Sequence, residues 1–355
     1  MISLVETTYL LSNEEYIRVG KSALIQVGVS TEHSDIVIQS LLDSDQKGIH
    51  THGLFRLPTY IKQISRGNIN PQPIIQLIEK GSNIKLLDGD SGLGSVNSFY
   101  AMKEAIKLSS EKGIGIVGVR NSNHFGTAAY YAELASSQNK IGIVMTNASP
   151  AIAPTGGKKP VLGNNPWSIS VPTHIGHPIT LDMANSVARG KIRIKALNGE
   201  PIPVGWALNS KGEPTTDANE ALEGLILPVG DHKGYGITLM VDILTGVLTG
   251  AYFGNQNPGI EEDGKRNNGH LFISLNPEAF MSIEEFKNRL NELINMIKSV
   301  PKINENTEIY LPGELEWKTK LSLKNDKIKL PERIFDRILS FCHEQQIQLP
   351  DYVSV

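Results

Sequence analysis

The chain has very little cysteine, no long apolar run and no large excess of either charge. Its 355 residues include one cysteine, Cys342, which excludes an intrachain disulfide framework and a zinc site built from several thiolates. The longest apolar stretch, residues 237–248, contains Asp242 and is too short to span a bilayer. A formal net charge of −3 gives no basic surface of the kind that nucleic acid requires. We therefore expect neither a membrane partner nor a nucleic-acid partner.

The start of the chain has no basic leader followed by apolar and small residues, because Glu6 interrupts a weak apolar run. We therefore expect a cytoplasmic protein. The abundant residue is glycine, with 33 glycines beside 19 prolines. The chain shows no fixed-period repeat and no low-complexity tract, and its glycines stand mainly at the ends of predicted elements. This distribution favours tight turns around a ligand over linkers or repeats.

The first sixty residues have a helical pattern. Ser12 with Glu15 forms a capping box, and a second cap at Ser30 opens another helix that ends near residue 48. A third helix is predicted from near Gly53 to residue 67, with Pro58 in its first turn. From residue 84 onward, short apolar runs alternate with helical patterns. Strands are predicted within residues 84–89, 113–120, 141–148, 167–173, 178–184 and 270–275, and helices over 98–110, 130–136, 236–250 and 282–300.

Two glycine motifs invite a Rossmann interpretation, and both stand in the wrong context. Gly113, Gly115 and Gly118 match G-x-G-x-x-G, but they lie inside a predicted strand and do not open a helix. Gly92 and Gly94 do stand between a strand and a helix, but Asn97 replaces the third glycine. The sequence therefore argues against a standard Rossmann fold.

The densest polar cluster lies at the start of the predicted third helix. His52 and Arg56 are four residues apart and would share a helical face, with Tyr60 one turn further. An imidazole can transfer a proton near neutral pH, and a guanidinium group can hold a carboxylate with two hydrogen bonds. This pair suits a 2-oxo or 2-hydroxy acid. An exposed polar helix start without a role, or a metal site that uses His50 and His52, are the alternatives.

Three further clusters contain candidate chemical groups. His124 follows a buried strand among small polar residues, where it is either a catalytic group or a histidine hydrogen-bonded in a turn. Asp182 ends an apolar strand, where it would orient a histidine, bind a cofactor hydroxyl or amide, or cap the segment that follows. Lys233 stands among glycines just before a helix, in a setting that suits phosphate binding or, alternatively, a Schiff base.

Taken together, these segments resemble the malate/L-lactate dehydrogenase family of the non-Rossmann type. The matching stretches run in the family's order from about residue 12 to 330. They are GIHTHGLFR, VRNSNHFGTAAYYA, TNASPAIAPTGG, LGNNPWSISVP, LDMANSVARGKI, GEPIPVGWALNSKGEPTTD, LPVGDHKGYGITLMVDILTGVLTGA, NNGHLFISLNPEAF and LPGE. The resemblance implies interconversion of a 2-oxo acid, or its cyclic imine, and a 2-hydroxy or amino acid with NAD or NADP, of which NAD is favoured.

The resemblance also implies a fold and an assembly. It implies an α/β (α+β-like) fold, in which a helical lobe stands beside a mixed, largely antiparallel sheet that binds the dinucleotide in a non-Rossmann manner. The helical lobe would contain residues 1–75 with parts of 215–260 and 325–355, and the sheet domain residues 76–214 with 265–324. The resemblance implies a homodimer whose active site lies between the domains.

The resemblance assigns roles residue by residue. His52 or His124 would transfer the proton, with Asp182 tuning the site, while Arg56 and Tyr60 would bind the substrate carboxylate. The residues implied for cofactor binding are Asn147, Pro178, Ile179, Thr180, Leu181, Asp182, Met183, Ala184, His232, Lys233, Gly313 and Glu314. No metal is implied. The alternative function is a metal-dependent hydrolase or lyase that uses His50, His52 and His124. Residues 255–267 are expected to form a surface loop near the substrate or a partner subunit.

Overall fold

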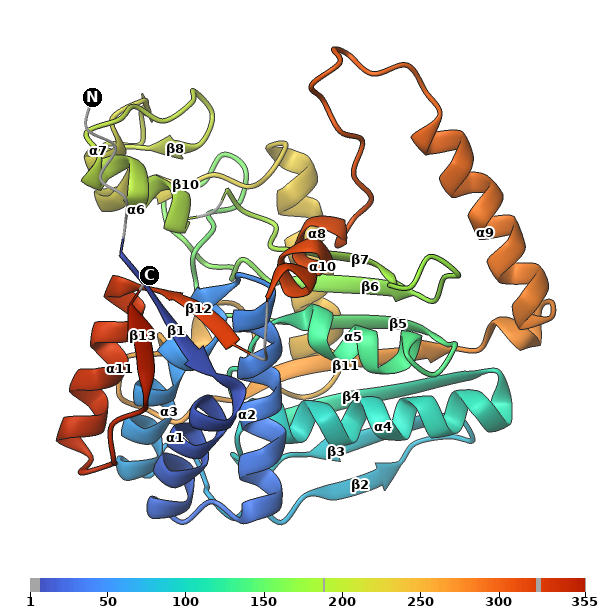
Figure 1. Ribbon diagram of the computed structural model, residues 1–355, viewed down its shortest axis with the longest axis horizontal. Helices are drawn as coiled ribbons and strands as arrows, with labels where there is room; N and C mark the ends of the chain where they lie inside the picture. The colour runs from blue at the N-terminus through green and yellow to red at the C-terminus, as the bar shows by residue number, and fades with distance from the viewer. Residues whose placement is uncertain (1–6, 188, 324–326, 355) are drawn as a thin grey trace.

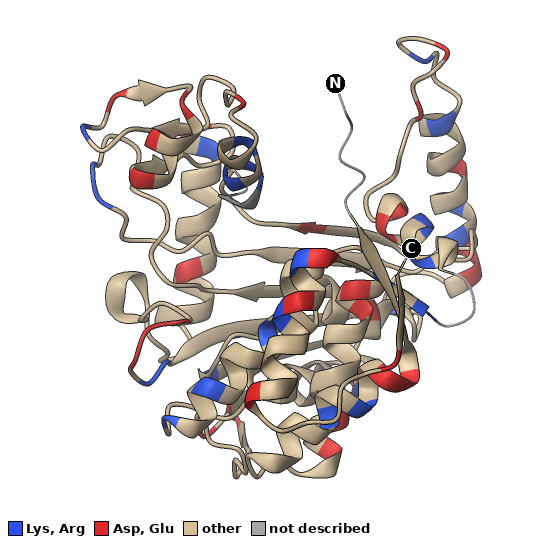
Figure 2. Cartoon of the chain, turned by 60° about the vertical axis from the view of Figure 1, so that its left-hand side comes forward, with Lys and Arg blue, Asp and Glu red and all other residues tan. Residues whose placement is uncertain are grey.

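The computed structural model describes residues 7–187, 189–323 and 327–354. Glu6 lies outside these residues, together with the weak apolar run that it interrupts. Within the described ranges, no helix is both long enough and apolar enough to cross a membrane. Charged residues of both signs are spread over the molecule (Figure 2), in keeping with its small net charge.

A seven-stranded sheet forms the centre of the molecule (Figure 1). Its strand order is β2-β3-β4-β11-β5-β6-β7, and only β3 and β4 run parallel. The predicted mixed, largely antiparallel sheet is therefore confirmed. The strands are β2 (Gln76–Glu79), β3 (Ile84–Asp88), β4 (Ile114–Ser122), β5 (Ile141–Thr146), β6 (Trp167–Val171), β7 (Ile179–Met183) and β11 (Asn268–Leu275).

Helices cover both faces of this sheet. On one face, α4 (Gly94–Lys112) packs on β4 and β11, and α5 (Ala128–Ser136) packs on β5 and β6. The other face carries α8 (His232–Asp242) and the π-helical turn η3 (Ile243–Val247). Gly115 faces α4, whereas Gly118, three residues further along β4, faces Thr249 just after η3. The first of these two layers contains an apolar core that includes Val117, Tyr131 and Phe272.

Strand β11 comes from far along the chain and lies between β4 and β5. The fully buried His270 on β11 ties the three strands together through its two ring nitrogens. Its Nδ1 lies 2.7 Å from Thr146 Oγ1 on β5, and its Nε2 lies 2.9 Å from Ser122 Oγ on β4. Burial lowers the pKa of His270 to about 3, so the ring is neutral at pH 7. It also stacks on Phe125, with 4.9 Å between ring centroids.

A helical lobe packs at one end of the sheet (Figure 1). It consists of α1 (Asn13–Gln26), α2 (Thr31–Gln46), α3 (Leu57–Ser65) and α11 (Glu332–Glu344), with a small sheet of β1 (Thr8–Ser12), β12 (Lys327–Pro331) and β13 (Tyr352–Ser354). The predicted caps are confirmed, because the side chains of Ser12 and Ser30 accept from the N–H groups of Glu15 and His33. The core of the lobe includes Tyr16, Leu57 and Phe335.

A third, smaller core lies within residues 192–226 and includes Ile192, Ala207 and Ala221. Its elements are α6 (Arg189–Leu197), β8 (Ala207–Leu208), β9 (Pro214–Thr215), α7 (Ala218–Glu223) and β10 (Leu225–Ile226). The remaining short elements are the 3₁₀ turns η1 (His50–His52), η2 (Leu54–Arg56), η4 (Gly254–Gln256) and η5 (Pro277–Ala279), and the helix α10 (Glu314–Ser322). The domain boundaries stay a prediction.

Helix α9 (Ile283–Lys298) follows the sheet and stands away from the rest of the molecule (Figure 1). Its predicted amphipathic pattern is confirmed, but its apolar stripe is not covered. Ile294 is the one buried residue of the helix, whereas Leu293 and Met296 are 51% and 64% exposed. An exposed apolar stripe of this kind is typical of surfaces that contact another protein.

Two predicted helices begin at other residues than expected. The third helix begins at Leu57, with Pro58 in its first turn, because the preceding residues form two separate 3₁₀ turns. The helix expected over 236–250 begins at His232 and ends in the π-helical turn η3. At the start of α4, a Cβ on Gly94 would lie 2.1 Å from the carbonyl oxygen of Asn123. Gly94 therefore serves close packing against the loop that follows β4, in place of nucleotide binding.

Candidate active site

Two histidines from different parts of the fold face each other beside the sheet. His52 lies in η1, and His124 lies in the loop that follows β4. Their ring centroids are 5.7 Å apart, and both rings are half-buried. Tyr60 on α3 reaches the same place, with its hydroxyl 2.8 Å from Nδ1 of His124. The structure thus brings together three of the residues that the sequence singled out.

The prediction that His52 and Arg56 share a helical face was wrong. They belong to the separate turns η1 and η2, on either side of Gly53. Arg56 folds back, and its Nε donates to the carbonyl oxygen of Thr51 at 2.7 Å. Its terminal amino groups make no hydrogen bond within the described residues. They are therefore able to hold a carboxylate with two parallel bonds.

A second arginine, Arg266, approaches the same cluster and was missed in the sequence. It lies just before β11 and is 7% exposed. Its guanidinium group donates to Asn268 Oδ1 at 2.9 Å, to Ser149 Oγ at 3.1 Å and to the carbonyl oxygen of Pro258. No carboxylate forms an ion pair with it among the residues that the structure describes. A buried cation held only by neutral acceptors is suited to an anionic ligand.

The sequence carried one signal that points to Arg266. The pair Lys265–Arg266 stands a few residues before the predicted apolar strand 270–275, and functional groups gather where strands meet loops. The sequence does not show which strand pairs with that strand. Because β11 pairs antiparallel with β4, Asn268 lies opposite Ser122, so the start of β11 lies beside the loop that holds His124.

Burial is the main cause that keeps both imidazoles uncharged, and nearby positive charge adds to it. Burial lowers the pKa of His52 to about 4, and the positive charge of Arg56 lowers it as well. Burial also lowers the pKa of His124 well below its ordinary value, as do the charges of Arg56 and Arg266. Burial raises the pKa of the Tyr60 hydroxyl against the opposing effect of the two arginines. At pH 7 the cluster therefore holds neutral imidazoles, a protonated phenol and two guanidinium groups.

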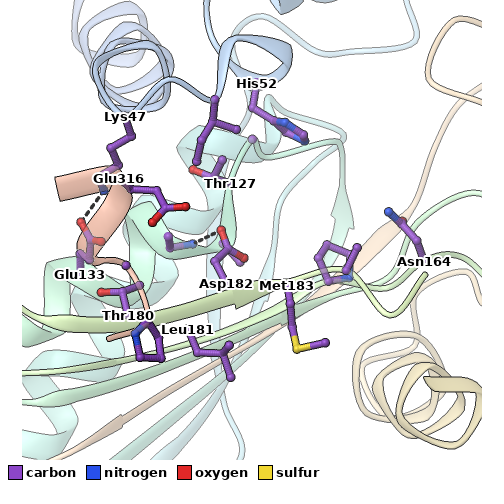
Figure 3. Close-up of a pocket in the computed structure, with 18 residues that line it drawn as sticks. Lys47, His52, Thr127, Glu133, Asn164, Thr180, Leu181, Asp182, Met183 and Glu316 are labelled. Atoms are coloured by element: carbon purple, nitrogen blue, oxygen red, sulfur yellow. Dashed lines mark hydrogen bonds and ion pairs between the residues drawn. The ribbon is translucent and has the colours of Figure 1, made fainter. Parts of the chain in front are cut away.

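A cavity of about 340 Å³ opens beside His52 along strand β7 (Figure 3). Asp182 on β7 faces this cavity and accepts from the N–H of Ala129 at 3.1 Å, at the start of α5. Although Asp182 is an exposed residue of β7, desolvation by the cavity walls raises its pKa to about 6. The N–H of Ala129 and the charge of Lys47 oppose this rise, whereas the carboxylates of Glu133 and Glu316 add to it.

The cavity wall contains more negative than positive charge. Glu133, Asp182 and Glu316 line it from α5, β7 and α10, and the single lining ammonium group is that of Lys47 (Figure 3). That ammonium group is already bound by two carboxylates, at 2.6 Å by Glu133 and at 2.7 Å by Asp43. Within the described residues, Glu316 forms no ion pair. The electrostatic potential of the cavity is therefore negative.

Half of the residues implied for cofactor binding line this cavity. Those that line it are Thr180, Leu181, Asp182, Met183, Ala184 and Gly313. Pro178 lines a neighbouring open pocket that shares Glu133 with the first, and Ile179 lies between the two on β7. Glu314 does not line the cavity. Although burial raises the pKa of its carboxyl, the N–H of Leu311 and the ammonium groups of Lys298 and Lys318 lower it to about 2.

Two predicted cofactor contacts have other partners in this structure. The Asn147 amide is engaged by the protein, because it donates to the carbonyl oxygen of Tyr252 at 2.5 Å and accepts from the N–H of Gly269 at 3.0 Å. His232 and Lys233 open α8 beside the segment that follows β7, since Gly234 packs on the carbonyl oxygen of Asn185. The N–H of Lys233 is bonded within its own turn, so its ammonium group is the part that remains for an anion.

The loop of residues 255–267 has a definite place in the structure. It joins the helical lobe to the sheet, because Gln63 Nε2 on α3 donates to the carbonyl oxygens of Ile260 and Glu262, each at 2.9 Å. Ser149 Oγ donates to the carbonyl oxygen of Pro258 at 2.6 Å. The loop thus fixes the position of Arg266 from both sides.

The geometry gives no support to a metal-dependent hydrolase. Within the described ranges, no group of three or more histidine, cysteine, aspartate or glutamate side chains is arranged to hold a metal ion. Of the three histidines considered for that alternative, His50 is held apart, because its Nδ1 lies 2.8 Å from Asp45 Oδ1. His52 and His124 face the arginines.

Comparisons with known proteins agree with this arrangement. The malate/L-lactate dehydrogenase family matches residues 11–339. L-sulfolactate dehydrogenase of Methanocaldococcus jannaschii is 41% identical over 334 residues, which cover 93% of this chain and 96% of that protein. The crystal structure of malate dehydrogenase from Entamoeba histolytica superimposes with a TM-score of 0.90 at 32% identity, covering 97% of this chain and 100% of that one.

Relatives in this family are named for either nicotinamide cofactor. Ureidoglycolate dehydrogenase (NAD⁺) of Escherichia coli is 32% identical over 93% of this chain and 95% of its own. (2R)-3-Sulfolactate dehydrogenase (NADP⁺) of Chromohalobacter salexigens is 32% identical over 94% of this chain and 98% of its own. The predicted family is confirmed: the chain belongs to the malate/L-lactate dehydrogenase family of oxidoreductases.

Proposed function

We propose that this protein interconverts a dianionic 2-oxo acid and the matching 2-hydroxy acid, with a nicotinamide dinucleotide as the hydride carrier. The observation that carries this proposal is the approach of two guanidinium groups, Arg56 and Arg266, to the His124–Tyr60 pair. Two fixed cations match an acid with two negative groups, as in malate or sulfolactate. The names of the relatives, which include malate and sulfolactate dehydrogenases, agree with this substrate class.

The two arginines would divide the substrate between them. Arg56 has the larger electrostatic effect on His124, so we assign it to the carboxylate next to the reacting carbon. Arg266 would then hold the second acidic group, near the start of the central strand β11. Because each guanidinium group is anchored by protein acceptors, the substrate is oriented with little loss of side-chain entropy on binding.

His124 would transfer the proton on the C2 oxygen, assisted by Tyr60. The hydrogen bond between Tyr60 and Nδ1 of His124 can run in either direction, because a phenol both donates and accepts and a neutral imidazole has one N–H. In reduction, the imidazolium form of His124 gives its Nε2 proton to the C2 oxygen and returns to the neutral ring, whose Nδ1–H donates to Tyr60. When Tyr60 accepts, Nε2 is free to take the proton of the hydroxy acid.

The cavity along β7 has polar groups that fit a dinucleotide, with Thr180, Asp182 and Gly313 on its wall. When bound there, the nicotinamide would supply or accept the hydride at C2. The carboxylates of Asp182 and Glu316 would accept hydrogen bonds from ribose hydroxyls. We propose NAD over NADP, since a 2′-phosphate would meet the negative wall formed by Glu133, Asp182 and Glu316.

We further propose that the chain works as a homodimer. The uncovered stripe of α9, which includes Leu293 and Met296, is one candidate contact surface. A second exposed apolar stripe follows α8 and η3, with Met240, Val247 and Leu248 each more than half exposed. The chemistry of both stripes suits a second copy of this chain, because homodimer interfaces are more apolar than ordinary protein surface.

The dianion assignment predicts how the chain treats oxaloacetate and pyruvate. Replacement of Arg266 by Gln should lower kcat/KM for oxaloacetate by roughly 10- to 100-fold, the effect of losing a charge-assisted hydrogen bond. For pyruvate, which has no second acidic group, kcat/KM should change less than about threefold. The exposed Arg193→Gln is the matched control. Equal losses on both substrates, or a wild-type preference for pyruvate, would contradict the assignment.

The charge of the cavity predicts which reduced cofactor binds. In fluorescence titrations at low salt, NADPH should bind at least about tenfold more weakly than NADH. At low salt, the repulsion between the 2′-phosphate and the cavity carboxylates is screened least. Glu316→Gln should narrow this difference, whereas Glu285→Gln on α9 should leave it unchanged. Equal affinities of the wild type for NADH and NADPH would contradict the NAD selectivity but not the proposed function. If neither cofactor binds, the proposed function itself fails.

The lowered histidine pKa values predict the pH profile of hydroxy-acid oxidation. A general base must be neutral, and a pKa of His124 below its ordinary value keeps it neutral to lower pH. We therefore expect kcat/KM for (S)-malate to show no histidine step near pH 6.5. A step near pH 6 is expected from Asp182, and Asp182→Asn should remove it. A step near pH 6.5 that persists in Asp182→Asn would argue against neutral, buried imidazoles.

The exposed stripe of α9 predicts the behaviour of the protein in sedimentation. The wild type should sediment with twice the mass of the 38.8 kDa chain. A charge in an apolar interface is costly, so Leu293→Glu with Met296→Glu should shift the equilibrium toward the monomer. Ile74→Glu, at another exposed apolar position, should not. A wild-type monomer would overturn the homodimer, and an unchanged variant dimer would move the interface away from α9.

A further inference from the structure

A buried carboxylate lies beneath the turns that hold His52 and Arg56. Asp45, on the last turn of α2, is 2% exposed. Its Oδ2 accepts from the Tyr16 hydroxyl at 2.6 Å and from the N–H of Leu54 at 2.8 Å. Its Oδ1 lies 2.8 Å from Nδ1 of His50. One side chain is thus bound by donors from α1, η1 and η2.

The position of the Asp45 carboxylate is unfavourable for a negative charge. Burial of a carboxylate disfavours its charged form, and the C-terminal end of a helix repels negative charge. The three hydrogen bonds offset these costs. The geometry therefore ties the N–H of Leu54 and the ring of His50 to a fixed point on α2, on both sides of His52.

Gly53 shows how closely the turn follows the carboxylate. A Cβ on Gly53 would lie 1.9 Å from Oδ2 and 2.1 Å from Cγ of Asp45. The backbone of Gly53 has φ −88° and ψ −147°, which other residues also adopt. Glycine is therefore required here by the contact with Asp45, and its backbone conformation does not require it. The same contact explains why the predicted third helix does not begin at Gly53.

These two turns also hold His52, which lies beside His124, and Arg56, which is assigned to the substrate. The N–H of His52 donates to the carbonyl oxygen of Ile49 at 2.9 Å, and the N–H of Arg56 donates to that of Gly53 at 2.9 Å. The guanidinium group of Arg56 is anchored on the carbonyl oxygen of Thr51. We propose that Asp45 is a positioning residue, which holds His52 and Arg56 in place through the turn that is moulded on its carboxylate.

The part of the test that measures turnover rests on the proposed function. Asp45→Ala removes the acceptor of three donors and should lower kcat/KM for oxaloacetate by at least about tenfold, as expected for misplaced substrate-binding groups. The affinity for NADH should stay within about twofold. Asp45→Asn should restore most of the activity, because its oxygen can accept from Tyr16 and Leu54 while its NH₂ can donate to Nδ1 of His50.

A double-mutant cycle separates this contact from a general loss of stability. Gly53→Ala in the wild type should lower kcat/KM by at least about tenfold, since its Cβ collides with the carboxylate. In the Asp45→Ala background the same change should cost less than about threefold, because the space is then free. Gly81→Ala, where a Cβ meets only Ile84 at 4.0 Å, is the matched control and should change neither activity.

All assays are run below the thermal transition of each variant, as followed by circular dichroism. Folded Asp45→Ala with wild-type kcat/KM, or additive effects in the cycle, would overturn the proposal. If the wild type reduces no 2-oxo acid, the proposed function fails, and the ring proton signals of His52 become the readout. Assigned by a His52→Gln variant, these signals should move in Asp45→Ala and stay in place in Gly81→Ala. Unmoved signals would reject the positioning role.

Discussion

The candidate site depends on one pairing in the sheet, the insertion of β11 between β4 and β5. This pairing joins segments that lie about 150 residues apart along the chain. It brings the loop with His124 beside the segment with Arg266, and His270 ties the three strands at that level. Without this order of strands, His124, to which we assign proton transfer, and the buried Arg266 would lie on different parts of the molecule. The sheet is thus the element that turns two separate loops into one site.

Local structure could be predicted wherever it depends on neighbouring residues. The caps at Ser12 and Ser30, the buried strands and the pattern of α9 follow from periodicity and capping, and the structure confirms them. The prediction was wrong where a distant group decides the backbone. The stretch around Gly53 has a helical spacing of polar residues, yet the carboxylate of Asp45 bonds the N–H of Leu54 and requires two turns instead.

Some residues of the site could be predicted from the sequence, and others could not. His52, His124, Tyr60 and Asp182 stand in dense polar clusters, and the structure places them around one cluster and its cavity. Arg266 stands in no motif, and its importance comes only from burial without a carboxylate partner. Burial and partners are properties of the folded chain, so a sequence shows the candidate groups more readily than the charges that surround them.

The two halves of the site differ in charge, and this difference would affect proton transfer in the proposed reaction. The half where β4 ends and β11 begins contains two guanidinium groups, which add to the effect of burial in lowering the pKa of His124. A dianionic substrate bound to Arg56 and Arg266 would cancel the repulsion that these cations exert on a protonated imidazole. The proton affinity of His124 would then rise only when the correct acid is bound. A monoanion would leave one cation uncompensated, so substrate charge would be selected in the proton transfer as well as in binding.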